Sequence, residues 1–401
     1  MKAVNIFTIS KPKRISSFGI INKIKKSTGE PSVGHAGTLD PLAEGVLVVG
    51  LGREATKKLS QIVEKEKEYI AGIKLGLSSS TDDSEGRKNK TPNVRPITLK
   101  EINSVVKNFI GTISQVPPAY SAIRLGGERA YKLARSGRPV ELKSRPVEIK
   151  SLKILKYKWP DLKIKVVTGP GVYIRSLARD IGTSLSTGAY MSSLKRTRVG
   201  NFKINQAISL EALAKKYLAQ RIDILKKGGV GIIPTDTIYG LVGRAWDKKA
   251  VGRIYKIRKR NPDKPFIILI SSLADLKKFG VKIDQPTEKI IKKYWPGPVS
   301  IILNCDKKLS YLHRGTDSLA FRWPNNSWLM ALLKKTGPLV APSANPEGQE
   351  PALTIKQAKR YFSNNVDFYI DQGKVVSQLS ALIKVVSGRI TVLRPGALNM
   401  K

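Results

Sequence analysis

Cysteine and histidine are nearly absent from this chain of 401 residues. It contains one cysteine, Cys305, and two histidines, His35 and His313. A single cysteine cannot form a disulfide within the chain, which favours a reducing compartment. Three such side chains are also too few for the four-ligand Cys/His sites that bind structural zinc. The composition therefore excludes a fold held together by disulfides or by such a zinc site.

Long hydrophobic runs are also missing. The longest ones, such as residues 266–270, have the length of a strand and fall far short of a membrane span. The first ten residues carry neither the apolar core nor the cleavage site of a signal peptide. We therefore expect a cytoplasmic protein that does not enter a membrane.

Acidic residues are scarce, because 30 Asp and Glu stand against 72 Lys and Arg, a formal charge of +42. Such an excess attracts polyanions such as nucleic acids. The lysines are spread along the chain, so a general enrichment in lysine is an alternative that composition leaves open. The length and a hydrophobic content of 41% predict two or three domains with cores of their own.

Alternating strand-like and helix-like segments predict an α/β protein made of two halves, residues 1–212 and 213–401. No linker rich in Gly, Ser or Pro separates them, and the join lies in a segment with a helical pattern. The elements expected in the first half are strands at 4–9 and 46–49, helices at 17–26 and 99–109, and an exposed loop or insertion over 78–96. The second half is expected to open with a helix over 210–227 and a buried strand over 230–234, with a further strand over 266–270.

The first half contains a glycine-rich loop with a carboxylate, Gly-His-Ala-Gly-Thr-Leu-Asp-Pro-Leu-Ala-Glu-Gly, at residues 34–45. Further blocks flank it in order: Lys11-Pro12 with Ser16-Ser17, Ala55-Thr56-Lys57, Lys67-Glu68-Tyr69, Pro117-Pro118-Ala119-Tyr120-Ser121-Ala122, Arg145-Pro146 and Gly171-Val172-Tyr173-Ile174-Arg175. Over roughly the first 210 residues, this series resembles the TruB family of tRNA pseudouridine-55 synthases. The resemblance implies an α+β mixed-sheet domain that isomerises a T-loop uridine of tRNA without a cofactor or metal.

The resemblance also implies three catalytic residues. Asp40 would be the catalytic carboxylate, and Arg175 would pair with it and keep it ionised. Tyr69 would stack on the flipped base and assist its deprotonation. Taken alone, an Asp before Pro is usually a turn residue and a Tyr in a strand-like segment usually belongs to the core, so these roles depend on the whole series of blocks.

Four further residues would contact the RNA or the base. By resemblance, Lys11 would support the site near the phosphates and His35 would fill the space left by the flipped nucleotide. Tyr173 would line the base pocket and Leu194 would cover it. Residues 79–86 depart from the family pattern at Ser79 and Ser80, and we do not expect this segment to be catalytic.

The second half carries another ordered series of blocks. They are Pro-Thr-Asp-Thr-Ile-Tyr-Gly-Leu at 234–241, Lys-Ile-Arg-Lys-Arg-Asn-Pro-Asp-Lys-Pro at 256–265, Tyr-Trp-Pro-Gly-Pro at 294–298, Ala-Phe-Arg-Trp-Pro-Asn at 320–325, Ala-Pro-Ser-Ala-Asn at 341–345 and Leu-Arg-Pro-Gly-Ala at 393–397. Over about residues 215–401, the series resembles the YrdC family of threonylcarbamoyl-AMP synthases. The resemblance implies a twisted-sheet α/β domain that joins threonine, bicarbonate and ATP, and a separate tRNA threonylcarbamoyl transferase as a partner.

All three substrates are anionic when they react, so the site needs several cations and neutral donors, with Mg²⁺ on the phosphates. The residues that the resemblance implies for threonine and ATP binding are Thr235, Thr237, Arg258, Arg260, Lys264, Arg322, Ser343, Asn345, Ser380 and Arg394. No protein side chain is expected to bind the metal. The chain has no Gly-x-x-x-x-Gly-Lys-[Ser/Thr] motif, so an ATP site here must be built without a P-loop.

Four positions of the second half depart from the family pattern. Arg258 and Asn261 replace a Lys and a Pro, Ala381 replaces a Thr, and Lys384 replaces an Asp. We interpret Ala381 as the loss of a nucleotide contact and Lys384 as a reversed charge. The second half could therefore instead be an RNA-binding module that replaces the small RNA-binding domain of many TruB relatives, which we do not find here.

A third alternative makes the whole chain a tRNA chaperone without catalysis. The set of Asp40, Tyr69 and Arg175 argues against this alternative, because folding of tRNA needs no such carboxylate.

Overall fold

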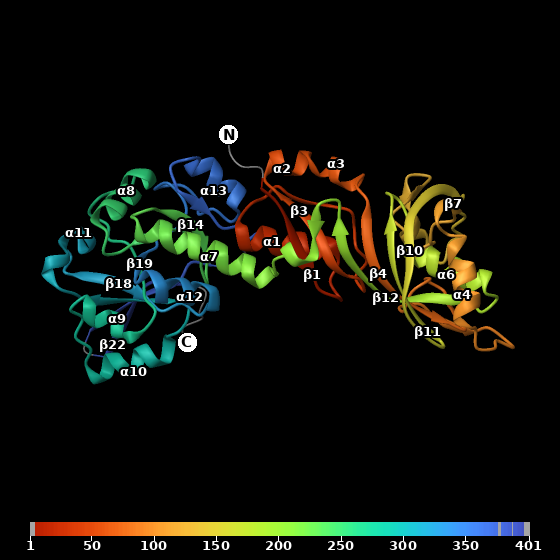
Figure 1. Cartoon of the computed structure of the whole chain (residues 1–401). Coiled ribbons are helices and arrows are strands. Elements are labelled where there is room, and N and C mark those ends of the chain that lie inside the picture. The colour runs from red at the N-terminus through yellow and green to blue at the C-terminus, as the bar shows by residue number, and fades with distance from the viewer. Residues whose placement is uncertain (1–4, 376–377, 387, 397–401) are drawn as a thin grey trace. The chain divides into compact units, whose positions relative to one another are not determined.

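The computed structural model describes residues 5–375, 378–386 and 388–396. Figure 1 labels the helices and strands. Two sheets of nine strands each, accompanied by helices, confirm the expected α/β class. Among the described residues, no helix is both long enough and apolar enough to cross a membrane.

The chain divides into two compact units. The N-terminal unit comprises residues 1–23 and 32–210, and the C-terminal unit comprises residues 24–31 and 211–401. Residues 24–31 include the end of helix α1 (Ser17–Thr28), and the sequence did not indicate that they group with the second unit.

The sheet of the N-terminal unit runs in the order β1-β3-β12-β4-β11-β10-β7, with β2 beside β3 and β13 beside β12. Its strands are β1 (Asn5–Lys11), β2 (Val33–Ala36), β3 (Glu44–Leu51), β4 (Lys67–Leu75), β7 (Gly111–Gln115), β10 (Arg145–Lys158), β11 (Asp161–Thr168), β12 (Ala189–Val199) and β13 (Phe202–Lys203). All neighbours are antiparallel except β3 and β12. In β4, alternate residues from Lys67 to Leu75 are buried, which gives this strand one core face.

Helices α4 and α6 contribute to the core on this buried face. The helices of the unit besides α1 are α2 (Arg53–Lys57), α3 (Leu59–Val63), α4 (Leu99–Lys107), α5 (Ala130–Arg135) and α6 (Ile174–Ser184), with a 3₁₀ turn η1 (Ile204–Gln206). Helix α4, expected from its periodicity, begins with a capping box in which the Thr98 hydroxyl accepts from Glu101 N–H and the Glu101 carboxylate accepts from Thr98 N–H.

The expectation of an exposed loop or insertion over residues 78–96 was wrong in part, because the segment contains a short hairpin and two buried residues, Ser79 and Asp83. Strand β5 (Leu77–Ser79) pairs with β6 (Lys88–Lys90), and Asp83 between them is buried. The burial of this carboxylate is tolerated because it accepts hydrogen bonds from the Thr81 hydroxyl and from Glu85 N–H. A second small hairpin joins β8 (Arg124–Leu125) and β9 (Glu128–Arg129).

The sheet of the C-terminal unit runs in the order β20-β14-β15-β19-β16-β18-β17-β21-β22. Its strands are β14 (Gly231–Pro234), β15 (Tyr239–Arg244), β16 (Ile268–Leu269), β17 (Val299–Asn304), β18 (Ser318–Arg322), β19 (Leu339–Val340), β20 (Phe368–Tyr369), β21 (Ala381–Val386) and β22 (Arg389–Arg394). The sheet contains three parallel pairs, β14 with β20, β16 with β18 and β17 with β21, among antiparallel ones, so it is also mixed. The strand expected over residues 266–270 is only the two-residue β16.

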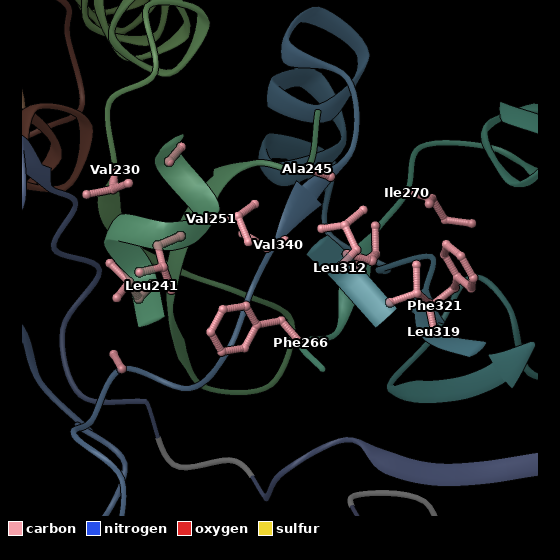
Figure 2. Packing of buried hydrophobic residues seen from close by; sticks show 14 of the residues in the cluster. Val230, Leu241, Ala245, Val251, Phe266, Ile270, Leu312, Leu319, Phe321 and Val340 are labelled. Carbon is pink, nitrogen blue, oxygen red and sulfur yellow. The ribbon is translucent and has the colours of Figure 1, made fainter. Parts of the chain in front are cut away.

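Helices surround this second sheet. They are α7 (Leu210–Lys226), α8 (Lys248–Arg258), α9 (Leu273–Lys278), α10 (Gln285–Tyr294), α11 (Ser310–His313), α12 (Ser327–Thr336) and α13 (Ile355–Phe362), with a 3₁₀ turn η2 (Lys307–Leu309). Figure 2 shows part of the apolar core, in which Val251 of α8 and Leu312 of α11 belong to the same cluster as Leu241, Leu319 and Phe321 of the strands. The apolar runs that predicted buried strands therefore contribute to the core of this unit.

Candidate functional site

The loop that follows β2 in the N-terminal unit carries Asp40, and three buried side chains hold this loop. The Ser17 hydroxyl donates to Leu39 O and accepts from Leu39 N–H. Arg196 donates from Nη2 to Gly37 O (2.9 Å) and from Nε to Val46 O (2.8 Å). The buried Lys11 ammonium donates to the carbonyls of Pro12, Pro41 and Ala43. The backbone around Asp40 is therefore fixed on both sides.

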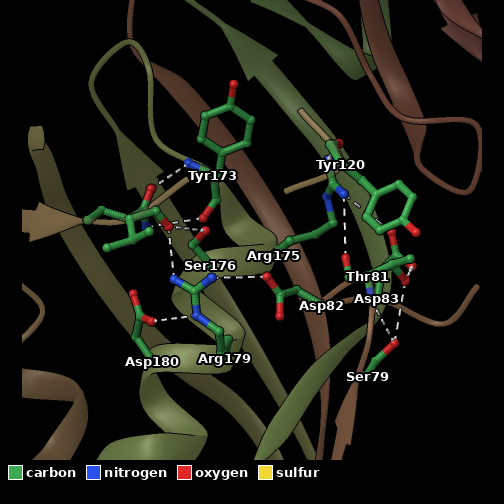
Figure 3. Close-up of polar contacts among 12 residues, drawn as sticks. Ser79, Thr81, Asp82, Asp83, Tyr120, Tyr173, Arg175, Ser176, Arg179 and Asp180 are labelled. Carbon is green, nitrogen blue, oxygen red and sulfur yellow. Dashed lines mark hydrogen bonds and ion pairs between the residues drawn. The ribbon is translucent and has the colours of Figure 1, made fainter. Parts of the chain in front are cut away.

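Arg175 faces the Asp40 carboxylate from the first turn of α6. Its Nε lies 3.1 Å from Asp40 Oδ2, and its Nη2 donates to Tyr120 O at 2.9 Å. On its other side, Nη1 lies 3.7 Å from Asp83 Oδ2. Figure 3 shows Arg175 between Tyr120 and the Thr81–Asp83 segment. The side chain of Arg175 is only 6% exposed, so these contacts fix its guanidinium in place.

The Asp40 carboxylate is held away from bulk water although 35% of its side chain is exposed to the adjoining cavities. Burial raises the pKa of Asp40 above its ordinary value of 3.8, and the negative charge of Asp83 adds to this rise. Arg175 and Lys11 oppose the rise, because a nearby cation favours the ionised form. Burial also lowers the pKa of Lys11 to about 8. A carboxylate with this environment is poorly solvated and therefore suited to react with or stabilise a cationic sugar carbon.

Two cavities meet at Asp40. The first, of about 340 Å³, is lined by Asp40, Arg175 and the other expected base-pocket residues Tyr69, Tyr173 and Leu194. The second, of about 360 Å³, shares Asp40 and Arg175 and includes His35. The first volume suits a single base with its sugar.

Lys11 lines neither cavity, contrary to the position expected for it near phosphates. It is fully buried and its three donors are taken by main-chain carbonyls, so the structure makes it a support of the Asp40 loop.

Three residues near Asp40 were missed as site residues in the sequence. Asp83 lies in the segment that was not expected to be catalytic, yet it contacts Arg175 directly. Tyr120 lines both cavities, and Arg196 lines the first. Adjacent carboxylates at 82 and 83 in a chain so poor in acids were the signal that could have found Asp83. Arg179 of α6 neutralises the other carboxylate, Asp82, at 3.0 Å (Figure 3).

In the C-terminal unit, Arg258 ends helix α8 and reaches the Ala-Pro-Ser-Ala-Asn loop. Its Nε donates to Asn345 O at 2.7 Å, and its Nη2 lies 3.3 Å from both Ser343 Oγ and Asn345 Oδ1. Burial lowers the pKa of Arg258 to about 10. This residue replaces the Lys of the family pattern, and its planar fork makes three contacts that a single ammonium could not match in the same geometry.

A cavity of about 370 Å³ lies beside this contact. Of the ten residues expected to bind threonine or ATP, five line it: Arg258, Arg260, Lys264, Ser343 and Arg394. Its floor is apolar and comes from the sheet, through Ile302, Ala320 and Leu382. Four cations around an apolar floor suit an anionic ligand with a flat apolar part.

The other five expected residues do not line this cavity and contact other protein groups. Thr235 and Thr237 bond through their hydroxyls at 3.1 Å, and Arg322 pairs with the buried Asp236 at 3.1 Å. Asn345 contacts Arg258, as described above. Ser380 lies 3.0 Å from the Ser300 hydroxyl, and its carbonyl accepts from Arg394. These residues brace the loops around the cavity.

The interpretation of Ala381 as a lost nucleotide contact was wrong. Ala381 is fully buried in the apolar core, whereas its neighbour Leu382 lines the cavity from the other side of β21. A hydroxyl at position 381 would therefore enter the core. Lys384, which reverses a charge, is exposed.

Within the described ranges, no three His, Cys, Asp or Glu side chains gather in a way that could hold a metal ion.

Family models match both units. A model for TruB family pseudouridylate synthases (N-terminal domain) matches residues 25–174, and one for the tRNA pseudouridylate synthase B C-terminal domain matches residues 175–227. The Sua5/YciO/YrdC model, described as telomere recombination, matches residues 223–396. The match at 175–227 runs from helix α6 to the end of helix α7.

Named relatives cover the N-terminal half. The tRNA pseudouridine synthase B of Parabacteroides distasonis is 42% identical over 226 residues, which are 55% of this chain and 95% of that protein. The tRNA pseudouridine synthase B of Phocaeicola vulgatus is 39% identical, and the match covers 55% of this chain and 97% of that protein. A crystal structure of P. abyssi Sua5 complexed with L-threonine is 28% identical with a TM-score of 0.43 and covers 45% of this chain. The match takes in 54% of that Sua5 chain, so about half of its length is represented here.

Proposed function

Since the N-terminal half of the chain belongs to the TruB family of pseudouridylate synthases and is followed by a Sua5/YciO/YrdC module, we propose that the protein is a bifunctional tRNA-modification enzyme. Its first unit would convert the T-loop uridine at position 55 of tRNA into pseudouridine. Its second unit would form threonylcarbamoyl-AMP. The observation that carries the first part is the ionic contact between Asp40 and Arg175 at the junction of two cavities.

In the first reaction, the flipped uridine would enter the 340 Å³ cavity against Tyr69. As the bond between C1′ and N1 breaks, the Asp40 carboxylate would bond to or stabilise C1′. The freed base then turns, C5 bonds to C1′, the proton on C5 leaves, and N1 takes up a proton. The reaction is an isomerisation, so no other reactant is consumed.

The environment of Asp40 supports this role for two reasons. Arg175 keeps the carboxylate ionised and oriented, while burial withholds the water that would weaken it as a nucleophile. Tyr173, at the N-terminus of α6, is fixed by Gln115, which donates to its carbonyl (3.2 Å) and accepts from its N–H (2.9 Å). The aromatic wall of the cavity is therefore preorganised.

The test uses tRNA labelled with tritium at C5 of uridine, because the isomerisation releases that hydrogen to water. We expect label to be released from tRNA that carries U55 and not from a transcript with C55. Release from the C55 transcript would place the reaction at another uridine, and no release from either would contradict the isomerase assignment.

In the second reaction, the carbamate formed from threonine and bicarbonate would attack the α-phosphate of ATP and expel pyrophosphate. Mg²⁺ would enter with the phosphates as part of the substrate. Arg260, Lys264 and Arg394 would surround the phosphates, with Arg258 holding the Ser343 loop behind them. These cations converge on a cavity of nucleotide size, which supports ATP over the alternative of RNA, whose backbone needs an extended basic surface.

The purified protein is incubated with ATP, Mg²⁺, threonine and bicarbonate, and the product is identified by mass spectrometry. We expect threonylcarbamoyl-AMP that disappears when threonine is omitted. A preparation that makes pseudouridine but not this product would instead favour the RNA-binding module.

A further inference from the structure

The loop between α11 and β18 contributes Thr316 to the cavity of the C-terminal unit, and Ser318 at the start of β18 follows it, although none of the sequence blocks includes either residue. Two of its residues that carry a Cβ, Arg314 and Asp317, have φ of 52° and 50°. This left-handed region is unfavourable for side chains other than glycine. The loop therefore depends on surrounding contacts to keep its conformation.

One buried imidazole provides these contacts. His313 is 2% exposed, and its Nδ1 accepts from Gly315 N–H at 3.2 Å and from Asp317 N–H at 3.3 Å. Its Nε2 lies 3.1 Å from Lys307 O. Because Nδ1 accepts two hydrogen bonds, it carries no hydrogen, and the ring hydrogen sits on Nε2, where it is donated to Lys307 O. The His313 carbonyl also accepts from Thr316 N–H at 2.9 Å.

The same loop supports a second wall of the cavity. The Arg314 guanidinium lies 4.2 Å from the centre of the Tyr255 ring, and Tyr255 stacks on Phe266 with ring centres 4.0 Å apart. The guanidinium of Arg260 lies 5.6 Å from the Phe266 ring. Phe266 and Arg260 both line the cavity. The Nε of Arg314 is buried and has no hydrogen-bond partner in the described part of the chain, while the guanidinium lies over the Tyr255 ring.

We infer that His313 is a positioning residue for the nucleotide: its neutral imidazole holds residues 313–318, which present Thr316 and Ser318 to the ligand and back the wall of Phe266 and Arg260. His313 itself touches no ligand. The inference rests on the proposed ATP chemistry of this unit and adds a residue that no motif of the sequence supplies.

The test compares full-length variants for Mg-ATP binding by calorimetry, for threonylcarbamoyl-AMP formation and for thermal unfolding. His313→Leu fills the space without an acceptor, whereas His313→Asn returns a carbonyl oxygen near the position of Nδ1. Thr336→Val is the matched control, because Thr336 is equally buried in this unit, donates to Leu332 O and does not line the cavity.

We expect His313→Leu to raise the Kd and KM for ATP about 10-fold, the effect of two lost hydrogen bonds, with little change in turnover at saturating ATP. His313→Asn should recover most of the affinity, and Thr336→Val should keep all of it despite a similar loss of thermal stability. Arg314→Met, which keeps the volume but removes the charge over Tyr255, should weaken ATP binding about 3-fold.

An ATP affinity of His313→Leu within twofold of the wild type overturns the inference, and so does an equal loss in Thr336→Val. If His313→Leu does not fold, the ATP affinity of Arg314→Met is the test instead. Wild-type affinity in that variant overturns the inference. If the folded wild-type protein binds no Mg-ATP, the proposed function of the unit is wrong. The inference about His313 is then wrong as well, because it rests on that function.

Discussion

The two units differ in how many of the expected residues reach their cavity. In the N-terminal unit, the three catalytic candidates and both base-pocket residues line one cavity. In the C-terminal unit, five of the ten expected binding residues line the cavity and five brace the loops behind it. A sequence block therefore marks a segment that builds a site, while only some of its side chains meet the ligand.

The chemistry that we propose for each site explains this difference. An isomerase that depends on one carboxylate must bring every partner to that atom, so Arg175, Tyr69 and Tyr173 all converge near Asp40. A site for a triphosphate spreads charge over several cations and needs rigid loops to carry them. The following predictions test this contrast, from the largest effect to the smallest.

Replacing Asp40 by Asn should abolish the activity of the first unit and leave that of the second unit unchanged, which is the largest expected difference. We expect pseudouridine formation in a single turnover to fall about 10⁴-fold or more, because the amide carries no charge and is a poor nucleophile. Threonylcarbamoyl-AMP formation should not change. Asp161→Asn, which removes an exposed carboxylate of the same unit, is the control and should keep full activity. Tritium release within 10-fold of the wild type in Asp40→Asn would refute the role of this carboxylate.

Replacing Arg258 by Met should have the opposite selectivity. The change leaves Asn345 O and the Ser343 hydroxyl without their buried donor, which costs roughly 2–3 kcal/mol, or about 100-fold in kcat/KM for threonylcarbamoyl-AMP formation. Pseudouridine formation should be unaffected. Arg253→Met on the same helix removes a half-exposed pair with Asp367 and should change neither activity by more than about twofold. Equal losses in both Arg variants would contradict this account.

The pH dependence of the isomerase should report the burial of Asp40. Because burial raises the pKa of Asp40, the carboxylate is lost as the pH falls through a value above 3.8, and kcat/KM should fall with it. The negative charge of Asp83 contributes to this rise, so Asp83→Asn should move the acid limb to lower pH. The measurement is the pH profile of tritium release, with circular dichroism to exclude unfolding. An acid limb at or below 3.8 in the wild type would contradict the assignment.

Restoring the family's Thr at position 381 should have the smallest effect on activity. The side chain faces the core, so Ala381→Thr should leave ATP affinity within about twofold while lowering the free energy of unfolding by about 1–3 kcal/mol. Denaturant unfolding and calorimetry measure the two effects. A marked gain in ATP affinity would instead place this side chain at the ligand.

Much of the secondary structure follows from local patterns. The helix expected over 99–109 forms as α4 because periodicity and its capping box agree, and the apolar run around 46–49 forms the buried strand β3. Within residues 78–96, the burial of Asp83 was not predicted because the segment is polar and contains Thr91-Pro92 and Arg95-Pro96, whereas Arg175 and Thr81 satisfy Asp83 in the interior. No local pattern could reveal a partner that lies 92 positions away along the chain.

For this protein, the sequence by itself determined the family of the first half, the resemblance of the second half to another family, the order of the units and the residues around which each site is built, because these depend on residue identity and spacing. Only the tertiary structure decided that Lys11 supports a loop, that Ala381 faces the core, and that His313 and Arg314 back the second cavity. The physical reason is that burial and hydrogen-bond partners arise from contacts between distant segments, which spacing along the chain does not encode.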